Sequence, residues 1–258
     1  MALYGILISL GALLAFFIGE KAVKKRNLPL TTYYHAVNGA LIGGLVGGRL
    51  YHILDYWSLY SRNPLLILQV WKGGMGIFGA LFGGVIGIGL ILFLAAKKKC
   101  EETLTSGFLL KWLDIFALGV PLIQAIGRWG NFFNHELYGK ETNLSWGLAF
   151  EGKRYHPLFL YESIANFALF LILLEIERSW SPENPTKQDN QTATTFKSGT
   201  IFFTYLTGYG LIRFFLEFLR LRSWTLHGIN VAQTISLLFI LTGIYNLRKR
   251  RILLRENN

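Results

Sequence analysis

The segment MGIFGALFGGVIGIGLILFLAA at residues 75–96 carries no charged residue and is followed at once by three lysines. A helix rises about 1.5 Å per residue, so roughly 20 apolar residues cross the ~30 Å hydrocarbon core of a bilayer. A water-soluble helix of this length needs a polar face, which this segment lacks. The segment therefore predicts a transmembrane helix in an integral membrane protein.

Further apolar blocks extend this prediction to both ends of the chain. Of its 258 residues 52% are hydrophobic and only 16% are charged, which is unusual for a soluble domain. We expect an all-α integral membrane fold, a single polytopic membrane domain over residues 1–258 with about seven transmembrane helices. The fourth is short for a full crossing and predicts a tilted or broken helix. The expected spans are residues 3–20, 36–55, 75–96, 112–126, 157–177, 199–219 and 229–247.

The positive charges predict an orientation. Most of the 26 lysines and arginines follow the first, third, fifth and seventh expected spans. Because cytoplasmic flanks are enriched in Lys and Arg, we expect the N-terminus outside and the C-terminus inside. Residues 127–156 then form a small external cap, and the polar segment 181–198 forms a flexible cytoplasmic linker. The first span has its basic residues after the apolar core, which favours a retained helix over a cleaved signal peptide.

The net charge of +11 does not indicate a nucleic-acid partner. The basic residues flank apolar blocks, as in KAVKKR and LRKRR, instead of lining a soluble face. This arrangement is typical of membrane flanks that contact anionic lipid, so the expected partner is the lipid bilayer. The five histidines are scattered and Cys100 is the only cysteine, so we expect no metal and no soluble cofactor.

Glycines recur every four residues in the second and third spans. Small residues at this spacing let transmembrane helices approach backbone to backbone. We therefore predict close packing between these helices and no phosphate-binding loop. The positions are Gly39, Gly43 and Gly47, then Gly79, Gly83 and Gly87.

The segment GRWGNFFNHELYG at residues 127–139 concentrates polar groups at the mouth of a span. Arg128 is costly near lipid and usually finds an anion, a carbonyl group or a watery cavity. Its planar fork matches a phosphate, while Asn131 and Asn134 can donate to phosphate or ester oxygens. We interpret the segment as a binding site for an anion. The alternative is an interfacial loop with a snorkelling arginine.

A second polar group lies in the sixth span. Tyr209, Arg213 and Glu217 recur every four residues, so they share one helical face that must point inward among Phe and Leu. Glu217 can pair with Arg213 as a structural lock, or hold it toward a ligand; the two are compatible. In the third group, HPLFLYE at residues 156–162, His156 and an intramembrane Tyr–Glu pair suit a cavity wall. They equally suit a helix start with proline in its first turn.

These residues together resemble the bacterial prolipoprotein diacylglyceryl transferases. GRWGNFFNHELYG is similar to the long and specific signature of that family. The family's seven spans, with the N-terminus outside and the C-terminus inside, agree with the orientation above. The resemblance continues through Tyr4-Gly5, GGRLYHILDYW (47–57), WKGGMGIFGALFGG (71–84), HPLFLYES (156–163) and YGLIRFFLEFLR (209–220).

The resemblance implies a reaction at the external leaflet of the bacterial inner membrane. Phosphatidylglycerol gives its diacylglyceryl group to the lipobox cysteine thiol of a prolipoprotein, forming a thioether and releasing glycerol phosphate. Arg128 would bind the phosphatidylglycerol headgroup, and Arg213 would act at the reaction centre. The candidate set is Tyr4, Arg128, Glu136, Tyr209 and Arg213 for catalysis, and Arg128, Asn131, Asn134, Gly139, His156 and Glu217 for substrate binding.

The chain departs from the family at Phe78, where many members carry histidine and others tyrosine. Phenylalanine cannot move a proton, so the thiol base lies elsewhere or the thiol ionises unaided beside the arginines. An alternative function is a non-catalytic or altered-substrate homologue that binds anionic phospholipid. A small transporter is disfavoured because no inverted repeat is visible. The candidates for the base are His135, Glu136, His156 and Tyr209.

Overall fold

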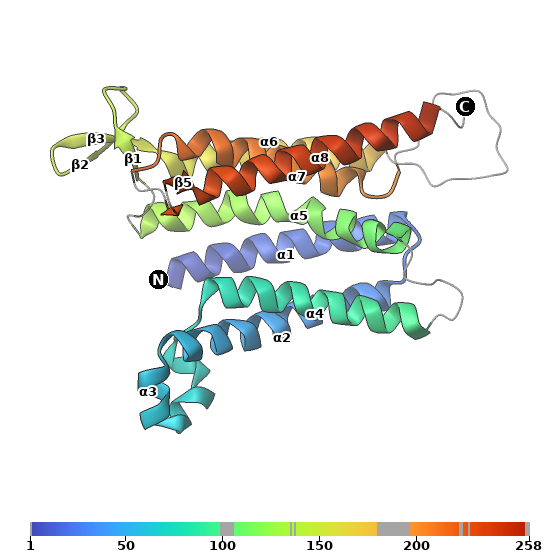
Figure 1. The fold of residues 1–258 in the computed structure, drawn as a ribbon, viewed down its shortest axis with the longest axis horizontal. Helices are drawn as coiled ribbons and strands as arrows, with labels where there is room; N and C mark the ends of the chain where they lie inside the picture. The colour runs from blue at the N-terminus through green and yellow to red at the C-terminus, as the bar shows by residue number, and fades with distance from the viewer. Residues whose placement is uncertain are drawn as a thin grey trace. The chain divides into compact units, whose positions relative to one another are not determined.

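The computed structural model describes residues 2–98, 106–134, 136, 138–179, 197–221, 224–226 and 228–255. The described chain is mostly helical (Figure 1). It divides into two compact units, one of Asn27–Leu109 and the other of Met1–Arg26 with Leu110–Asn258. The single polytopic membrane domain expected from the sequence stays a prediction.

The Asn27–Leu109 unit is built on two helices that approach very closely. A Cβ atom added at Gly43 would collide with the carbonyl oxygen of Gly83, and the reverse is also true. The predicted backbone-to-backbone packing of glycines is therefore confirmed. Between the two helices the chain forms one short α-helix and two 3₁₀ turns. The elements are α2 (Leu30–Asp55), α3 (Trp57–Arg62), η1 (Pro64–Leu68), η2 (Val70–Lys72) and α4 (Ile77–Lys98).

The described part of the other unit contains five long helices, with α5 entering it at Leu110, and two small sheets. In Figure 1, α5, α6, α7 and α8 run alongside one another. The helices are α1 (Ala2–Lys25), α5 (Ser106–Phe133), α6 (Leu158–Ser179), α7 (Thr200–Glu217) and α8 (Val231–Arg255).

Five of the described helices are long and apolar enough to cross a membrane. Helices α2 and α7 occupy the two other expected spans. Charged side chains interrupt both helices, Arg49 in α2 and Arg213 with Glu217 in α7. The number of seven crossings and their orientation stay predictions. The five candidate spans are Leu3–Lys25, Ile77–Lys97, Gly107–Phe133, Leu158–Ser179 and Val231–Arg250.

The expectation of a short or broken fourth span was wrong. Helix α5 continues through Pro121 to Phe133, so the segment that begins at Gly127 is helical and Arg128 projects from a helix. Glycine and asparagine usually weaken a helix, but tertiary contacts override this preference. The ring of Phe132 packs against Phe159 of α6, with 4.9 Å between their centroids.

The cap between α5 and α6 contains strands, which an all-α fold did not anticipate. Strands β1 (Tyr138–Glu141), β3 (Lys153–Pro157) and β2 (Leu148–Phe150) form an antiparallel sheet in that order. A second antiparallel pair, β4 (Thr225–Leu226) and β5 (Ile229–Asn230), follows α7. On the cap, the hydrogen bond and charge of Glu141 raise the pKa of Lys153. The expected linker 181–198 lies outside the described residues except for its last two positions.

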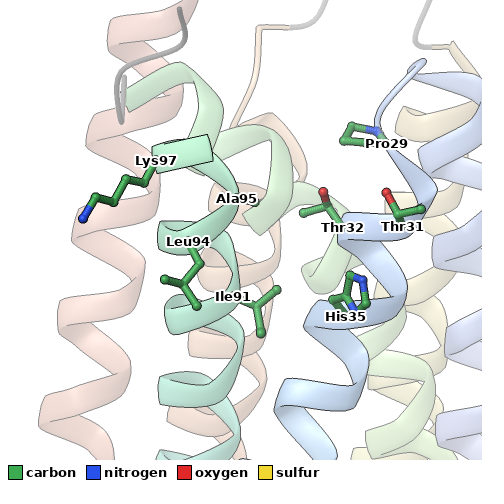
Figure 2. Close-up of a pocket in the computed structure, with 8 residues that line it drawn as sticks. All are labelled: Pro29, Thr31, Thr32, His35, Ile91, Leu94, Ala95 and Lys97. Atoms are coloured by element: carbon green, nitrogen blue, oxygen red, sulfur yellow. The ribbon is translucent and has the colours of Figure 1, made fainter. Parts of the chain in front are cut away.

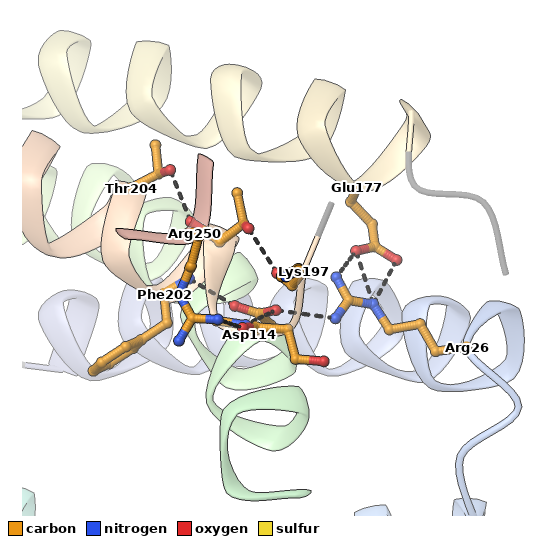
Figure 3. A network of polar contacts seen from close by, with 10 residues as sticks. Arg26, Asp114, Glu177, Lys197, Phe202, Thr204 and Arg250 are labelled. Carbon is orange, nitrogen blue, oxygen red and sulfur yellow. Dashed lines mark hydrogen bonds and ion pairs between the residues drawn. The ribbon is translucent and has the colours of Figure 1, made fainter. Parts of the chain in front are cut away.

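A buried charge network joins the helices at the end far from the cap (Figure 3). Arg26 at the end of α1 pairs with Asp114 of α5 at 3.2 Å and with Glu177 of α6. Asp114 also accepts the backbone N–H groups of Gly199 at 2.7 Å and Phe202 at 2.8 Å. Gly199 has no side chain to cap α7, so Asp114 supplies the missing N-terminal cap from another helix.

Candidate functional site

Two arginines from different helices meet at one buried carboxylate. Arg128 on α5 places Nη2 2.5 Å from Oε1 of Glu162 on α6. Arg213 on α7 places Nη1 3.8 Å from Oε2 of the same residue. Glu162 is only 2% exposed, and a buried carboxylate is tolerated where cations and hydrogen bonds compensate for lost hydration. Glu162 therefore holds both guanidinium groups at one place.

A second buried carboxylate fixes Arg213 from the cap side. Glu217 Oε2 lies 3.2 Å from Nη2 of Arg213 and 3.4 Å from Nη1 of Arg220. Asn230 donates from Nδ2 to the other oxygen of Glu217 at 3.4 Å. The ion pair between Arg213 and Glu217 anticipated from their spacing is present, and Arg213 lies between two acids.

The cluster keeps an excess of positive charge. Among the described residues, the guanidinium groups of Arg128, Arg213 and Arg220 face only the carboxylates of Glu162 and Glu217. The side chains of Arg128 and Arg213 remain 24% and 17% exposed, so both can still contact a ligand. A partly enclosed site with surplus positive charge attracts an anion.

Tyr209 belongs to the same cluster. It precedes Arg213 by one turn of α7, and the charges of Glu162, Arg213 and Arg128 act on its hydroxyl group. The expected shared face of Tyr209 and Arg213 is therefore confirmed.

Tyr4 lies against α5 at Gly130. A Cβ atom at Gly130 would collide with the ring of Tyr4, so glycine at this position leaves the room that the tyrosine occupies. Arg128 and Gly130 are two residues apart on α5, so their side-chain directions differ by about 200°, and Tyr4 contacts a different face of the helix from the one that carries the Arg128 side chain.

The remaining predicted residues form contacts of their own around the cap. Asn131, which is 8% exposed, donates from Nδ2 to Oε2 of Glu136 at 3.2 Å. Asn134 lies in the turn after α5, where its backbone N–H donates to Gly130. The backbone of Gly139 forms an isolated antiparallel β-bridge with Arg220, just after the end of α7.

His156 lies in β3, two residues before α6 begins, instead of in the helix start considered from the sequence, and it contacts an aromatic side chain. Its Nδ1 is 3.3 Å from the hydroxyl oxygen of Tyr161, which also accepts the indole N–H of Trp146 at 2.9 Å. Of the other candidates for the base, His135 lies outside the described residues. Phe78 belongs to the Asn27–Leu109 unit, where it is 58% exposed and lies 6.3 Å from the ring of Tyr51.

The sequence did not single out Glu162 as the link between the arginines. The sequence predicted Glu162 only as part of a cavity wall, although an acidic residue inside a membrane segment itself indicates a functional site. The described residues include no group of three or more His, Cys, Asp or Glu side chains that could hold a metal ion.

A separate cavity lies between α2 and α4, in the Asn27–Leu109 unit (Figure 2). Its volume is about 700 Å³, and it contains none of the predicted site residues. In Figure 2, the side chain of Ile91 points from α4 toward His35 of α2, while the side chain of Lys97 points away from the cavity. The lining residues are Pro29, Thr31, Thr32, His35, Ile91, Leu94, Ala95 and Lys97.

Comparison with known proteins gives one consistent result. A family model described as prolipoprotein diacylglyceryl transferase matches residues 1–248. A protein of Finegoldia magna named phosphatidylglycerol–prolipoprotein diacylglyceryl transferase is 36% identical over 241 residues, covering 93% of this chain and 88% of the relative. This chain is also similar to two proteins with the same name. The protein of Clostridioides difficile is 36% identical over 241 residues, covering 93% of this chain and 87% of the relative. The protein of Staphylococcus aureus strain Newman is 35% identical over 262 residues, covering 96% of this chain and 85% of the relative.

Proposed function

The chain belongs to the prolipoprotein diacylglyceryl transferase family, and we propose that it transfers the diacylglyceryl group of phosphatidylglycerol to prolipoproteins. The acceptor is the thiol of the lipobox cysteine, and glycerol phosphate leaves. The observation that carries this proposal is the convergence of Arg128 and Arg213 on Glu162, because it builds a positively charged site inside the helices.

The reaction exchanges one bond to carbon for another. The thiolate sulfur attacks the glycerol carbon that bears the phosphate ester, a C–S bond forms, and the C–O bond breaks. The leaving glycerol phosphate keeps the electron pair of the C–O bond and gains negative charge in the transition state. Positioned cations stabilise such charge most strongly where water is excluded.

We assign the two arginines to different parts of the reacting lipid. Arg128 holds the phosphate with its planar fork, and Arg213 faces the oxygen on which charge develops. Glu162 and Glu217 keep Arg213 in a single orientation, so little reorganisation is needed when the charge appears. The roles of the other predicted residues, Tyr4, Asn131, Asn134, Glu136, Gly139, His156 and Tyr209, stay predictions.

The incoming thiol must lose its proton before it attacks, because the neutral thiol is a poor nucleophile. Phe78 cannot accept that proton. We propose that the thiol ionises beside the arginines and releases its proton to water, because nearby cations favour the thiolate. The competing possibility is a homologue that binds anionic phospholipid without transferring it.

We place the protein in the bacterial inner membrane with seven spans, the N-terminus outside and the C-terminus inside. Helices α2 and α7 supply the two crossings beyond the five apolar helices. The cap and the arginine cluster then lie toward the external leaflet, where lipobox segments arrive. Reporter fusions test this orientation: a fusion after Arg255 should be active only with a cytoplasmic reporter, and a fusion in the cap only with an external one.

The activity is tested with the purified full-length protein, phosphatidylglycerol and a synthetic lipobox peptide, and mass spectrometry detects the thioether product. Arg128→Ala and Arg213→Ala should abolish product. Arg178→Ala is the matched control, because Arg178 is an exposed arginine of α6 whose pair with Glu175 lies at the surface. A lack of thioether product, with an active relative run alongside, would refute the proposed transfer.

A further inference from the structure

Two polar side chains join α5 to α7 one helical turn further from the cap than Arg128 and Tyr209. Gln124 precedes Arg128 by four residues, and Tyr205 precedes Tyr209 by four. The amide Nε2 of Gln124 donates to the hydroxyl oxygen of Tyr205 at 3.1 Å. One turn rises about 5.4 Å, so the pair lies roughly that far along the helices from the charged cluster.

This pair retains hydrogen-bonding capacity. The Tyr205 oxygen accepts from Gln124, so among the described residues its hydroxyl hydrogen remains available to donate to another group. Within the described parts of the chain, Oε1 of Gln124 is buried without a partner. Oε1 is an acceptor, so its partner must be a donor such as a water molecule; the group of this pair that can serve a ligand that only accepts is the hydroxyl hydrogen of Tyr205.

The two tyrosines are arranged as a short column. The rings of Tyr205 and Tyr209 stack with 5.7 Å between centroids and 14° between planes. A tyrosine offers an apolar body and a neutral hydrogen-bond donor at its tip. Such a column suits a ligand that changes from charged to weakly polar along its length.

We propose that Tyr205, oriented by Gln124, donates a hydrogen bond to an acyl-ester carbonyl of the diacylglyceryl group. The inference rests on the proposed function, which places the lipid phosphate at Arg128 and Arg213. The ester groups of the same lipid lie a few bonds further toward the acyl chains, which is the direction in which Tyr205 lies from the arginines. An ester carbonyl only accepts hydrogen bonds, and Tyr205 supplies a donor without adding charge.

The test compares phosphatidylglycerol with its diether analogue, which has the same headgroup and chain lengths but lacks carbonyl groups. Binding to the full-length protein is measured from the lipid-induced rise in unfolding temperature in detergent, and transfer is followed separately as KM and kcat. The wild type should bind the diester about 3- to 10-fold more tightly than the diether, the value of one hydrogen bond.

Tyr205→Phe should lose this preference. We expect its affinity for the diester to fall to the diether level and its KM to rise by the same factor, while kcat stays unchanged. Gln124→Leu should lower the preference by a smaller factor, because the hydroxyl group remains but is no longer oriented. Tyr245→Phe is the matched control, since Tyr245 of α8 is 66% exposed.

A Tyr205→Phe variant that retains the wild-type ratio of diester to diether affinity would overturn the inference. Equal weakening toward both lipids would also overturn it, because it would assign Tyr205 a purely structural role. A wild type that makes no thioether product would refute the proposed function instead. Because binding is measured separately from transfer, the lipid comparison would still decide the role of Tyr205.

Discussion

Replacement of Glu162 by glutamine tests whether one carboxylate organises the two arginines. The change keeps the size of the side chain and removes its charge. At an effective dielectric constant of about 20, the gross attraction is about 7 kcal/mol for the 2.5 Å contact with Arg128 and about 4 kcal/mol for the 3.8 Å contact with Arg213. Desolvation offsets much of this, and breaking a buried ion pair costs about 3–5 kcal/mol net.

The effect on catalysis follows from position. Without the carboxylate, the like-charged arginines repel each other and move from the places where they bind phosphate. A displacement of about 1 Å costs roughly 100-fold in rate. We therefore expect kcat/KM of Glu162→Gln to fall at least 100-fold, mostly through kcat, and Glu162→Asp to recover part of the loss.

The measurement is thioether formation per folded molecule, with folding checked by size-exclusion chromatography and thermal unfolding. Glu175→Gln is the matched control, because Glu175 lies on the same helix but makes only an exposed pair with Arg178 at 3.6 Å. This control should retain activity. A folded Glu162→Gln variant with kcat/KM within about threefold of the wild type would refute the positioning argument.

Three further changes probe the rest of the molecule. Asp114→Ala removes a buried partner of Arg26 and the cap of α7, so stability should fall by about 3–5 kcal/mol; an unchanged unfolding temperature would contradict this. Gly43→Val drives a side chain into the backbone at Gly83, and it should lower the unfolding temperature by several degrees, whereas an unchanged temperature would mean that the helices do not touch there. Phe78→His should change kcat less than about threefold if the thiol ionises beside the arginines. If the wild type forms no thioether and Phe78→His forms it readily, the result would instead support the alternative that this chain is a non-catalytic homologue.

Local sequence predicted much of the helical framework. Apolar blocks located the helices because a segment surrounded by lipid must satisfy its backbone polar groups internally. Glycine spacing predicted the contact between α2 and α4, because small residues repeated every four positions lie on one face of a helix. The cap strands were not predicted, because segments of three to five residues are too short to show a clear alternation of apolar and polar residues.

The apolar blocks and the identity of the charges that interrupt them were determined by the sequence alone. Only the tertiary structure decided which charges meet. Glu162 lies 34 residues from Arg128, and Asp114 caps a helix whose N-cap residue, Gly199, lies 85 residues later in the chain. Periodicity acts along a single helix and says nothing about which faces of different helices come together. That pairing is decided where the helices pack, because each buried charge must find its partner there.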